Sequence, residues 1–378
     1  MKFDTNYLDR IEQKIYLEGK DLQDQGTKIV GVYCAFTPKE IVAAAGAIPV
    51  GLCAGSQAPI NTAEQHLPRN LCPLIKSSYG HAVESSCPYF SSCDFLVADA
   101  TCDGKKKMFE LLSRIKPLHL LQLPQTSQND ESLAYWRNEM CKLIPVIENL
   151  TGNKITDQSL SEQISLYNRY RYAELRVFEL NTGEIPLLYG RELDSILGVV
   201  GFDCNLEDRI KELDASVKII SRRKTDKEFL DNIKHRPKII VTGCPNTNKK
   251  VLNLLEESGA VVVGMENCGG QKTLTRLVDE NKDPLTALAE RYLGIPCSCM
   301  TPNNARLDLI GQLIKDYHAD GVLELTWQGC HTYNVEAFSV KEYVTGKCGK
   351  PYLQIETDYS MNDSSQIKTR IEAFLELC

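Results

Sequence analysis

The chain has 378 residues, of which 43% are hydrophobic, and a net charge of −7 from 43 basic and 50 acidic side chains. Such a composition is typical of a globular protein and excludes disordered, collagen-like and coiled-coil chains. The longest basic run, Lys105-Lys106-Lys107, is too short for a nucleic-acid surface. Because there is neither an apolar stretch of roughly 18 residues nor a signal-peptide core, we expect a cytoplasmic protein without membrane contact.

Apolar segments alternate with helical patterns in the first half of the chain. The sequence predicts strands over 28–36, 48–53, 94–102 and 119–124, a helix beginning at Pro38 and another over 105–115. Strands that alternate with helices indicate a parallel sheet with right-handed connections. The first half is therefore predicted to be an α/β unit.

The same pattern restarts near residue 237. Strands are predicted over 237–245, 260–270, 321–330 and 351–358, and helices over 248–259, 306–319, 339–346 and 365–377. The intervening sequence is polar and mostly helical. We therefore predict a first domain over 1–155, a helical linker or cap over 156–235 and a second domain over 236–378.

Fifteen cysteines are many for a cytoplasmic protein, and their odd number excludes complete pairing within one chain. Each half carries a cysteine after its first strand, after its second strand and after a later strand. These residues are Cys34, Cys72 and Cys102 in the first half and Cys244, Cys268 and Cys330 in the second. Since ligands of such sheets bind at the carboxyl ends of the strands, we expect the six thiols to face one cleft.

The spacing of the cysteines favours a cluster over zinc, because the chain has no C-x-x-C pair. Cys87, Cys244, Cys297 and Cys299 remain open between a ligand role and burial as a small apolar residue. A cysteine can also be buried as a small apolar residue. We expect that role for Cys53, Cys93, Cys141, Cys204, Cys348 and Cys378.

Seven segments around these residues resemble the 2-hydroxyacyl-CoA dehydratase superfamily, and more closely its branch of double-cubane-cluster proteins. They are LPRNLCPLIKSSYG (67–80), TCDGKKKM (101–108), TGCP (242–245), ENCGG (266–270), IPCSCMTPN (295–303), QGCHTYNVE (328–336) and IETDYS (355–360). They occur in consistent order from about Ile29 to the C-terminus. The resemblance therefore covers most of the chain.

The resemblance implies two Rossmann-like, doubly wound domains that face each other across a cluster-binding cleft. It implies a homodimer with an 8Fe-9S cluster of two cubanes, each held by three cysteines. In a dehydratase subunit, by contrast, the implied ligands of a single 4Fe-4S cluster are Cys72, Cys102 and Cys330. The double cubane would add Cys34, Cys244 and Cys268. The implied partner is a separate ATP-hydrolysing iron–sulfur activase, since this chain lacks the P-loop motif.

Two further residues are candidates for acid catalysis. His331 directly follows Cys330 and would donate a proton to a reduced substrate, although it could instead only orient the loop. Glu356 lies at the end of another predicted strand and has the same two possible roles. Lys105-Lys106-Lys107 either forms a solvated helix face or offsets the charge of a cluster.

The function expected from these features is that of an oxygen-sensitive iron–sulfur reductase acting on a small molecule. The alternative from the lyase class is a 2-hydroxyacyl-CoA dehydratase subunit with one 4Fe-4S cluster and no net reduction. A non-catalytic electron carrier or metal-storage protein is the third possibility. Iron content separates the first two, at about eight against about four irons per chain.

Overall fold

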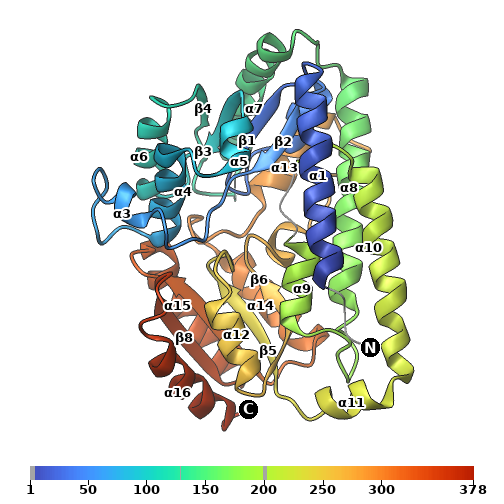
Figure 1. Ribbon diagram of the computed structural model, residues 1–378, viewed down its shortest axis with the longest axis vertical. Coiled ribbons are helices and arrows are strands. Elements are labelled where there is room, and N and C mark those ends of the chain that lie inside the picture. Colours follow the sequence, from blue (N-terminus) through green and yellow to red (C-terminus); the bar gives the residue numbers. More distant parts are fainter. Residues whose placement is uncertain (1–4, 128, 199–201) are drawn as a thin grey trace.

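Two four-stranded sheets form the centre of the computed structural model, which describes residues 5–127, 129–198 and 202–378. Figure 1 shows the sheets in two lobes that follow one another along the long axis. The first sheet has the order β2-β1-β3-β4 and the second has the order β6-β5-β7-β8, and all pairings are parallel. The strands are β1 (Ile29–Tyr33), β2 (Ile48–Gly51), β3 (Phe95–Asp99), β4 (Leu118–Leu121), β5 (Lys238–Gly243), β6 (Val261–Glu266), β7 (Gly321–Trp327) and β8 (Tyr352–Thr357).

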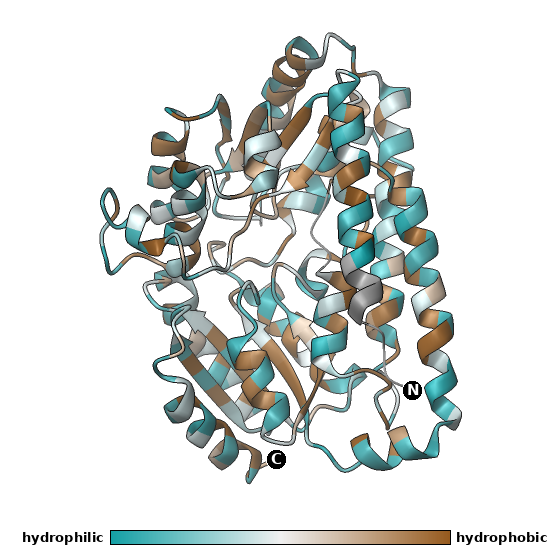
Figure 2. Cartoon of the chain, in the orientation of Figure 1, coloured by the Kyte–Doolittle hydropathy of each residue, from teal (hydrophilic) through white to brown (hydrophobic). Residues whose placement is uncertain are grey.

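Continuous apolar runs explain these strands. All residues of β1, β6 and β7 are buried, as expected for parallel strands covered on both faces. Figure 2 shows brown, hydrophobic stretches along strands of both sheets. Every strand predicted from the sequence is present, and the predicted fold class of two α/β, Rossmann-like sheets is confirmed.

Helices cover the sheets and connect the lobes. The first lobe has α2 (Lys39–Ala44), α3 (Ile60–Ala63), α4 (Pro73–Glu84), α5 (Pro88–Ser92), α6 (Asp103–Leu112) and α7 (Asp130–Thr151). The second has α12 (Lys250–Glu257), α13 (Pro284–Leu293), α14 (Asn304–Asp316), α15 (His331–Glu342) and α16 (Ser364–Leu375). Short 3-10 helices span Arg222–Thr225 and Gln271–Thr273, and a π-helix spans Tyr343–Lys347. The helix predicted over 339–346 is thus the end of α15, which begins eight residues earlier, and the π-helix that follows it.

Long helices run along one side of both lobes. They are α1 (Thr5–Asp24), α8 (Asp157–Glu179) and α10 (Leu206–Ser221), with α9 (Gly190–Leu197) and α11 (Lys227–Ile233) nearby. Side-chain caps fix where α8 and α10 begin: Thr156 and Ser159 form a capping box, and Asn205 accepts from the amide of Asp208. Helices α8 to α11 fall within the predicted helical linker, whose boundaries at 156 and 235 stay a prediction, whereas α1 belongs to the predicted first domain.

One segment of the second half packs on the first lobe. Helix α13 contacts α7, and its Ala287 and Leu288 belong to the same buried cluster as Leu143 of α7. A hydrogen bond supports this contact, because Arg137 Nε of α7 donates to Thr286 Oγ1 of α13 at 2.9 Å. Asn168 Nδ2 of α8 also donates to the carbonyl of Val278, ahead of α13, at 2.8 Å. The two lobes are therefore joined through α13 as well as through α8.

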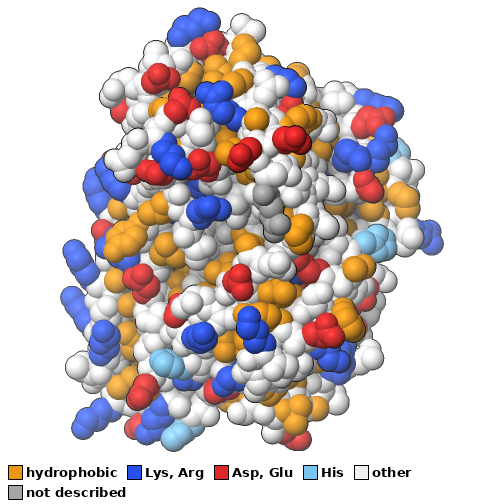
Figure 3. Space-filling view, turned by 180° about the vertical axis from the view of Figure 1, so that it is seen from behind, with side chains coloured by type: hydrophobic (Ala, Val, Ile, Leu, Met, Phe, Trp, Pro, Cys, Tyr) orange, Lys and Arg blue, Asp and Glu red, His pale blue; other side chains and the backbone are white. Residues whose placement is uncertain are grey.

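The surface carries both signs of charge. On the face shown in Figure 3, acidic and basic side chains are interspersed and form no single basic block. A nucleic-acid surface would carry a basic stripe or patch, which this face does not show. Among residues 5–127, 129–198 and 202–378, no helix combines the length and the hydropathy needed to cross a bilayer.

Candidate functional site

A cavity of about 1170 Å³ lies where the carboxyl ends of the two sheets meet. Nine of the fifteen cysteines line it: Cys34, Cys53, Cys72, Cys102, Cys244, Cys268, Cys297, Cys299 and Cys330. The structure thus brings all six cysteines that were predicted as ligands to one cavity. All fifteen cysteines are free thiols, so a disulfide bond prevents none of them from binding a metal.

Helix N-termini position three of these sulfurs. Cys72 precedes α4, Cys102 precedes α6 and Cys330 precedes α15. Backbone amides of the first helical turn favour the charged form of each thiol and so act to lower its pKa; they belong to Leu74 and Ile75 at Cys72, to Lys105 at Cys102 and to Tyr333 at Cys330. Amide dipoles at a helix N-terminus favour negative charge, so this arrangement stabilises thiolates.

The first group of sulfurs joins both lobes. The Cys330 thiolate accepts hydrogen bonds from the thiols of Cys244 and Cys72, which lowers the pKa of Cys330. The pKa of Cys72 is raised by the same contact with Cys330 and by burial, whereas burial comes first for Cys244. The thiol of Cys330 therefore lies beside those of Cys244 and Cys72, which come from different lobes, and this suits ligands of one metal group.

The second group surrounds Cys297. A hydrogen bond from the Cys299 thiol, with help from the charge of Lys272, lowers the pKa of Cys297 to about 6. Burial raises the pKa of Cys268 to about 11, although Lys272 opposes the rise, and burial also raises that of Cys34. Cys34 has a φ of 76°, an uncommon conformation for a residue with a Cβ atom, directly after β1.

Two findings on the cysteines differ from the sequence prediction. Cys244 lies with Cys72 and Cys330, whereas Cys102 lies between the two groups, close to both Cys330 and Cys297. Cys53 lines the cavity although we expected a structural role for it. It follows the end of β2, so the rule of strand ends could have identified it. Cys87, whose role the sequence left open, does not line the cavity and instead precedes α5.

The lysine run divides between cavity and surface. Lys105 lines the cavity, and although burial disfavours its ammonium group, the charges of Cys34, Cys53 and Cys102 raise its pKa. Lys106 instead reaches Asp103 at 2.9 Å on the solvent side, and Lys107 pairs with Glu110 there. One of the three lysines is thus placed to offset thiolate charge.

The two predicted acids have different positions. His331 is exposed and lines the cavity at the first residue of α15. Glu356 is exposed on β8, accepts a hydrogen bond from Asn334 Nδ2 at 3.2 Å, and does not belong to the cavity lining. Only His331 therefore has direct access to the thiols, and the catalytic role of each residue stays a prediction.

Comparison with known proteins identifies the family to which these cysteine-bearing segments belong. Residues 34–378 match the family described as 2-hydroxyglutaryl-CoA dehydratase, D-component. The chain belongs to this family. The match begins at Cys34 and includes all nine cysteines that line the cavity.

Three relatives illustrate the range of proteins that this chain resembles. It is 42% identical to "Putative dehydratase subunit YjiM" of Escherichia coli, over 96% of this chain and 94% of the relative. It is 24% identical to the (R)-phenyllactyl-CoA dehydratase beta subunit of Clostridium sporogenes, over 99% and 98%. It is 23% identical to one of the benzoyl-CoA reductase subunits of Thauera aromatica, over 71% and 69%. Relatives are therefore described as subunits of dehydratases and of a reductase.

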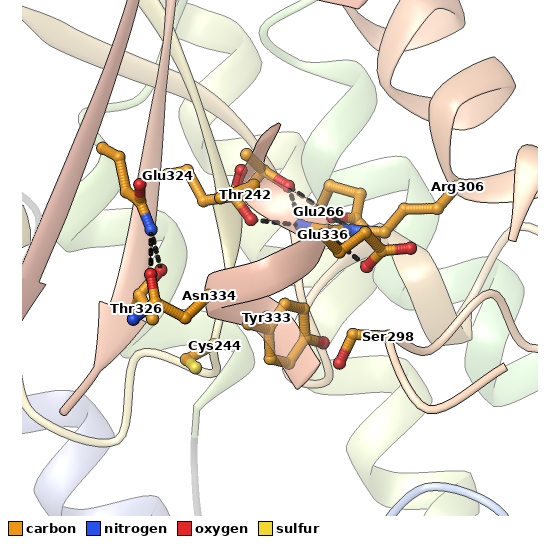
Figure 4. Close-up of polar contacts among 12 residues, drawn as sticks. Thr242, Cys244, Glu266, Ser298, Arg306, Glu324, Thr326, Tyr333, Asn334 and Glu336 are labelled. Carbon is orange, nitrogen blue, oxygen red and sulfur yellow. Dashed lines mark hydrogen bonds and ion pairs between the residues drawn. The ribbon is translucent and has the colours of Figure 1, made fainter. Parts of the chain in front are cut away.

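A buried ion network supports the second lobe (Figure 4). Arg306 of α14 is fully buried and contacts Glu266 Oε2 at 3.1 Å, Glu324 Oε1 at 2.9 Å and Glu336 Oε2 at 2.6 Å. It also donates to Thr242 Oγ1 at 3.0 Å. A guanidinium presents five donors in a rigid fork, so this one group satisfies several acceptors at once. The network joins Thr242 near the end of β5, Glu266 at the end of β6 and Glu324 in the middle of β7. Cys244, Cys268 and Cys330 follow these three strands in the sequence.

Two further contacts connect this network to the cavity wall. Lys272 pairs with Glu266 Oε1 at 3.0 Å and donates to the hydroxyl of Tyr333 at 2.5 Å. Ser298, between Cys297 and Cys299, donates to Thr332 Oγ1 at 3.0 Å, which ties this loop to the start of α15. Figure 4 shows Ser298 beside the ring of Tyr333. Both groups of cysteines therefore rest on one polar framework.

The donor set fits a polynuclear iron–sulfur group. Soft thiolates prefer iron–sulfur clusters, copper(I) and zinc, and the cavity offers nine of them. Within the described residues, no three His, Cys, Asp or Glu side chains are arranged for a single metal ion. Thiols spread over two walls of a large cavity thus suit a group with several metal atoms better than mononuclear zinc.

Proposed function

We propose that this chain is an iron–sulfur reductase that holds an 8Fe-9S double-cubane cluster and reduces a small molecule at it. The observation that carries the proposal is the set of nine thiols from both lobes around one cavity. A single 4Fe-4S cluster of a dehydratase subunit would use three of them. The thiols beyond these three, and the division of the thiols into two groups, support a cluster of two cubanes.

The two groups suggest which residues would hold the cluster. We assign Cys72, Cys244 and Cys330 to one half, because Cys330 lies beside each of the other two. The other half is drawn from Cys34, Cys102 and Cys268, with Cys297 as the remaining candidate in the same wall. This assignment keeps the six ligands predicted from the sequence.

Residues of the chain would perform the supporting chemistry. When bound, such a cluster supplies electrons at low potential. Lys105 would offset negative charge at the thiolates, and the amides at the start of α4, α6 and α15 would donate hydrogen bonds to them. His331 would hold a proton at the cavity rim. Glu356 lies outside the cavity lining and would act through Asn334, which donates a hydrogen bond to it.

A second protein would supply the electrons. The sequence has no P-loop motif, so we assign ATP hydrolysis to a separate iron–sulfur activase that docks on a homodimer of this chain. An oxygen-sensitive cluster of this kind would require an anaerobic, reducing cytoplasm. The domain boundaries at 155 and 235 belong to the same proposal.

A second candidate function is that of a dehydratase subunit with one 4Fe-4S cluster. The names of the relatives favour it, since two of those given above are described as dehydratase subunits. In that case one electron would be recycled and the reaction would involve no net reduction. The chain would then require a different second subunit and a site for coenzyme A.

Metal analysis of the anaerobically purified protein separates these functions. Iron and acid-labile sulfide are quantified per chain, and turnover is measured with an activase and ATP. About eight irons with net reduction supports the reductase, and about four irons supports the dehydratase subunit. Iron without turnover indicates a carrier or storage protein, and stoichiometric zinc without iron contradicts both enzymes.

A further inference from the structure

Away from the cysteines, two arginines from different helices line the same cavity. Arg171 lies on α8 and Arg291 on α13, and their side chains are 5% and 4% exposed. The ring of Tyr292 lies beside both, with the guanidinium carbon of Arg291 4.3 Å from its centroid and that of Arg171 5.8 Å from it. Two buried positive charges are therefore close together on one wall.

The carboxylate of Glu40 lies beside this pair of arginines, and it forms its ion pair with Arg171. Glu40 of α2 is fully buried and accepts a hydrogen bond from Arg171 Nη2 on one oxygen and from the Tyr292 hydroxyl, at 2.7 Å, on the other. Arg171 Nη2 also donates to the Tyr292 oxygen at 3.1 Å. Burial opposes the charge of Glu40, yet Arg171 and Arg291 lower its pKa. Glu40 is thus an anion that neutralises one guanidinium.

Arg291 has no acidic partner within the described part of the chain. Its Nε donates to the carbonyl of Arg276 at 3.2 Å and its Nη2 donates to the carbonyl of Thr273, whereas Nη1 has no hydrogen bond there. Burial and the charge of Arg171 lower the pKa of Arg291 to about 10. Two guanidiniums and one carboxylate leave one buried positive charge beside the cavity, and an unpaired buried charge is costly.

We propose that Arg291 binds the carboxylate of a small organic substrate inside this cavity. A guanidinium matches a carboxylate in shape and charge, and Nη1 is the nitrogen left for it. The surplus of one positive charge fits a monoanion, whereas phosphate groups carry about −1.5 to −2 at pH 7. Phe178, Leu193 and Leu197 line the same cavity and would contact the organic part.

This inference deepens the proposed function, because the role of the bound anion as a substrate rests on it. The test uses the anaerobically purified holoprotein and its Arg291→Met, Arg291→Lys and Arg276→Met variants. The Met variant at 291 keeps the Glu40–Arg171 pair intact and should fold. Arg276 is exposed nearby and is the matched control. Iron content is measured for each variant.

Binding of acetate, propionate, butyrate and inorganic phosphate is measured by isothermal titration and by thermal unfolding. We expect the carboxylates to bind and stabilise wild type and Arg276→Met equally, and Arg291→Met to bind them at least about tenfold more weakly. The Lys variant should retain intermediate affinity. Equal binding by wild type and Arg291→Met overturns the proposal, as does Arg291-dependent binding of phosphate alone. Failure of binding with about eight irons per chain rejects only this site, whereas absence of iron rejects the reductase.

Discussion

The backbone amide of Trp327 donates a hydrogen bond to the sulfur of Cys244, with 3.4 Å between nitrogen and sulfur. Trp327 is the last residue of β7, and Cys244 directly follows the neighbouring strand β5. This contact therefore joins the carboxyl ends of the two strands beside the cavity. The Trp327 indole also donates to the carbonyl of Pro245 at 3.1 Å. The sulfur of Cys244 is thereby held beside that of Cys330.

Replacing Cys244 with serine should remove iron without unfolding the protein. The change is small in volume, yet it deletes a thiolate of the first group, so we expect iron to fall from about eight to about four per chain. Iron analysis and electron paramagnetic resonance of the reduced protein measure this loss. Cys348→Ser, at a cysteine outside the cavity, should keep full iron content. Unchanged iron in Cys244→Ser would remove this residue from the ligand set.

Replacing Arg306 with methionine should destabilise the second lobe strongly. The change leaves the carboxylates of Glu266, Glu324 and Glu336 without their shared cation. Loss of one partner of a buried ion pair costs about 3–5 kcal/mol in the free energy of unfolding. Denaturant titration measures this cost. Lys368→Met, which breaks an exposed pair with Glu372, is the control and should leave the midpoint unchanged.

Glu174 should make the protein less stable as the pH rises from about 4.5 to about 7. Burial raises the pKa of Glu174 to about 7, although Tyr170 donates to it and Arg209 lies nearby. In this range the unfolded chain releases the proton while the folded chain retains it, so unfolding becomes more favourable. Relative to Glu174→Gln, the wild type should lose about 2 kcal/mol across this window. Parallel pH profiles of both proteins would contradict the raised pKa.

Two substitutions separate the candidate proton donors. His331→Ala should lower turnover about 100-fold, because general acid catalysis contributes by roughly that factor, while iron content stays unchanged. Glu356→Gln should have a smaller effect, since Glu356 does not line the cavity. Steady-state rates with an activase and ATP measure both effects. A larger loss in Glu356→Gln than in His331→Ala would reverse this assignment.

The strands and their cysteines were predictable from the sequence. Parallel strands buried on both faces are continuous apolar runs, so their ends could be placed within a few residues. Once the strand ends were placed, Cys34, Cys102 and Cys330 followed at one edge, and the structure places all three around the cavity. The same rule applied to Cys53 would have included it.

The grouping of the thiols was not predictable, because it depends on how the two lobes face each other. Cys72 of the first lobe lies beside Cys330 of the second only through that orientation. The ion pair of Arg171 with Glu40 joins residues 131 positions apart, and no local pattern marks such a contact. Spacing along the chain carries little information on contacts of this range.

The packing of α13 on the first lobe limits how the cavity can open. The polypeptide that carries Cys297 and Cys299 leaves the second lobe, packs against α7 and then returns to α14. A hinge motion that separated the two sheets would have to break the bonds of Asn168 and Arg137 to this crossing segment. Opening the cavity by such a motion would therefore cost these hydrogen bonds together with the apolar packing of α13 on α7.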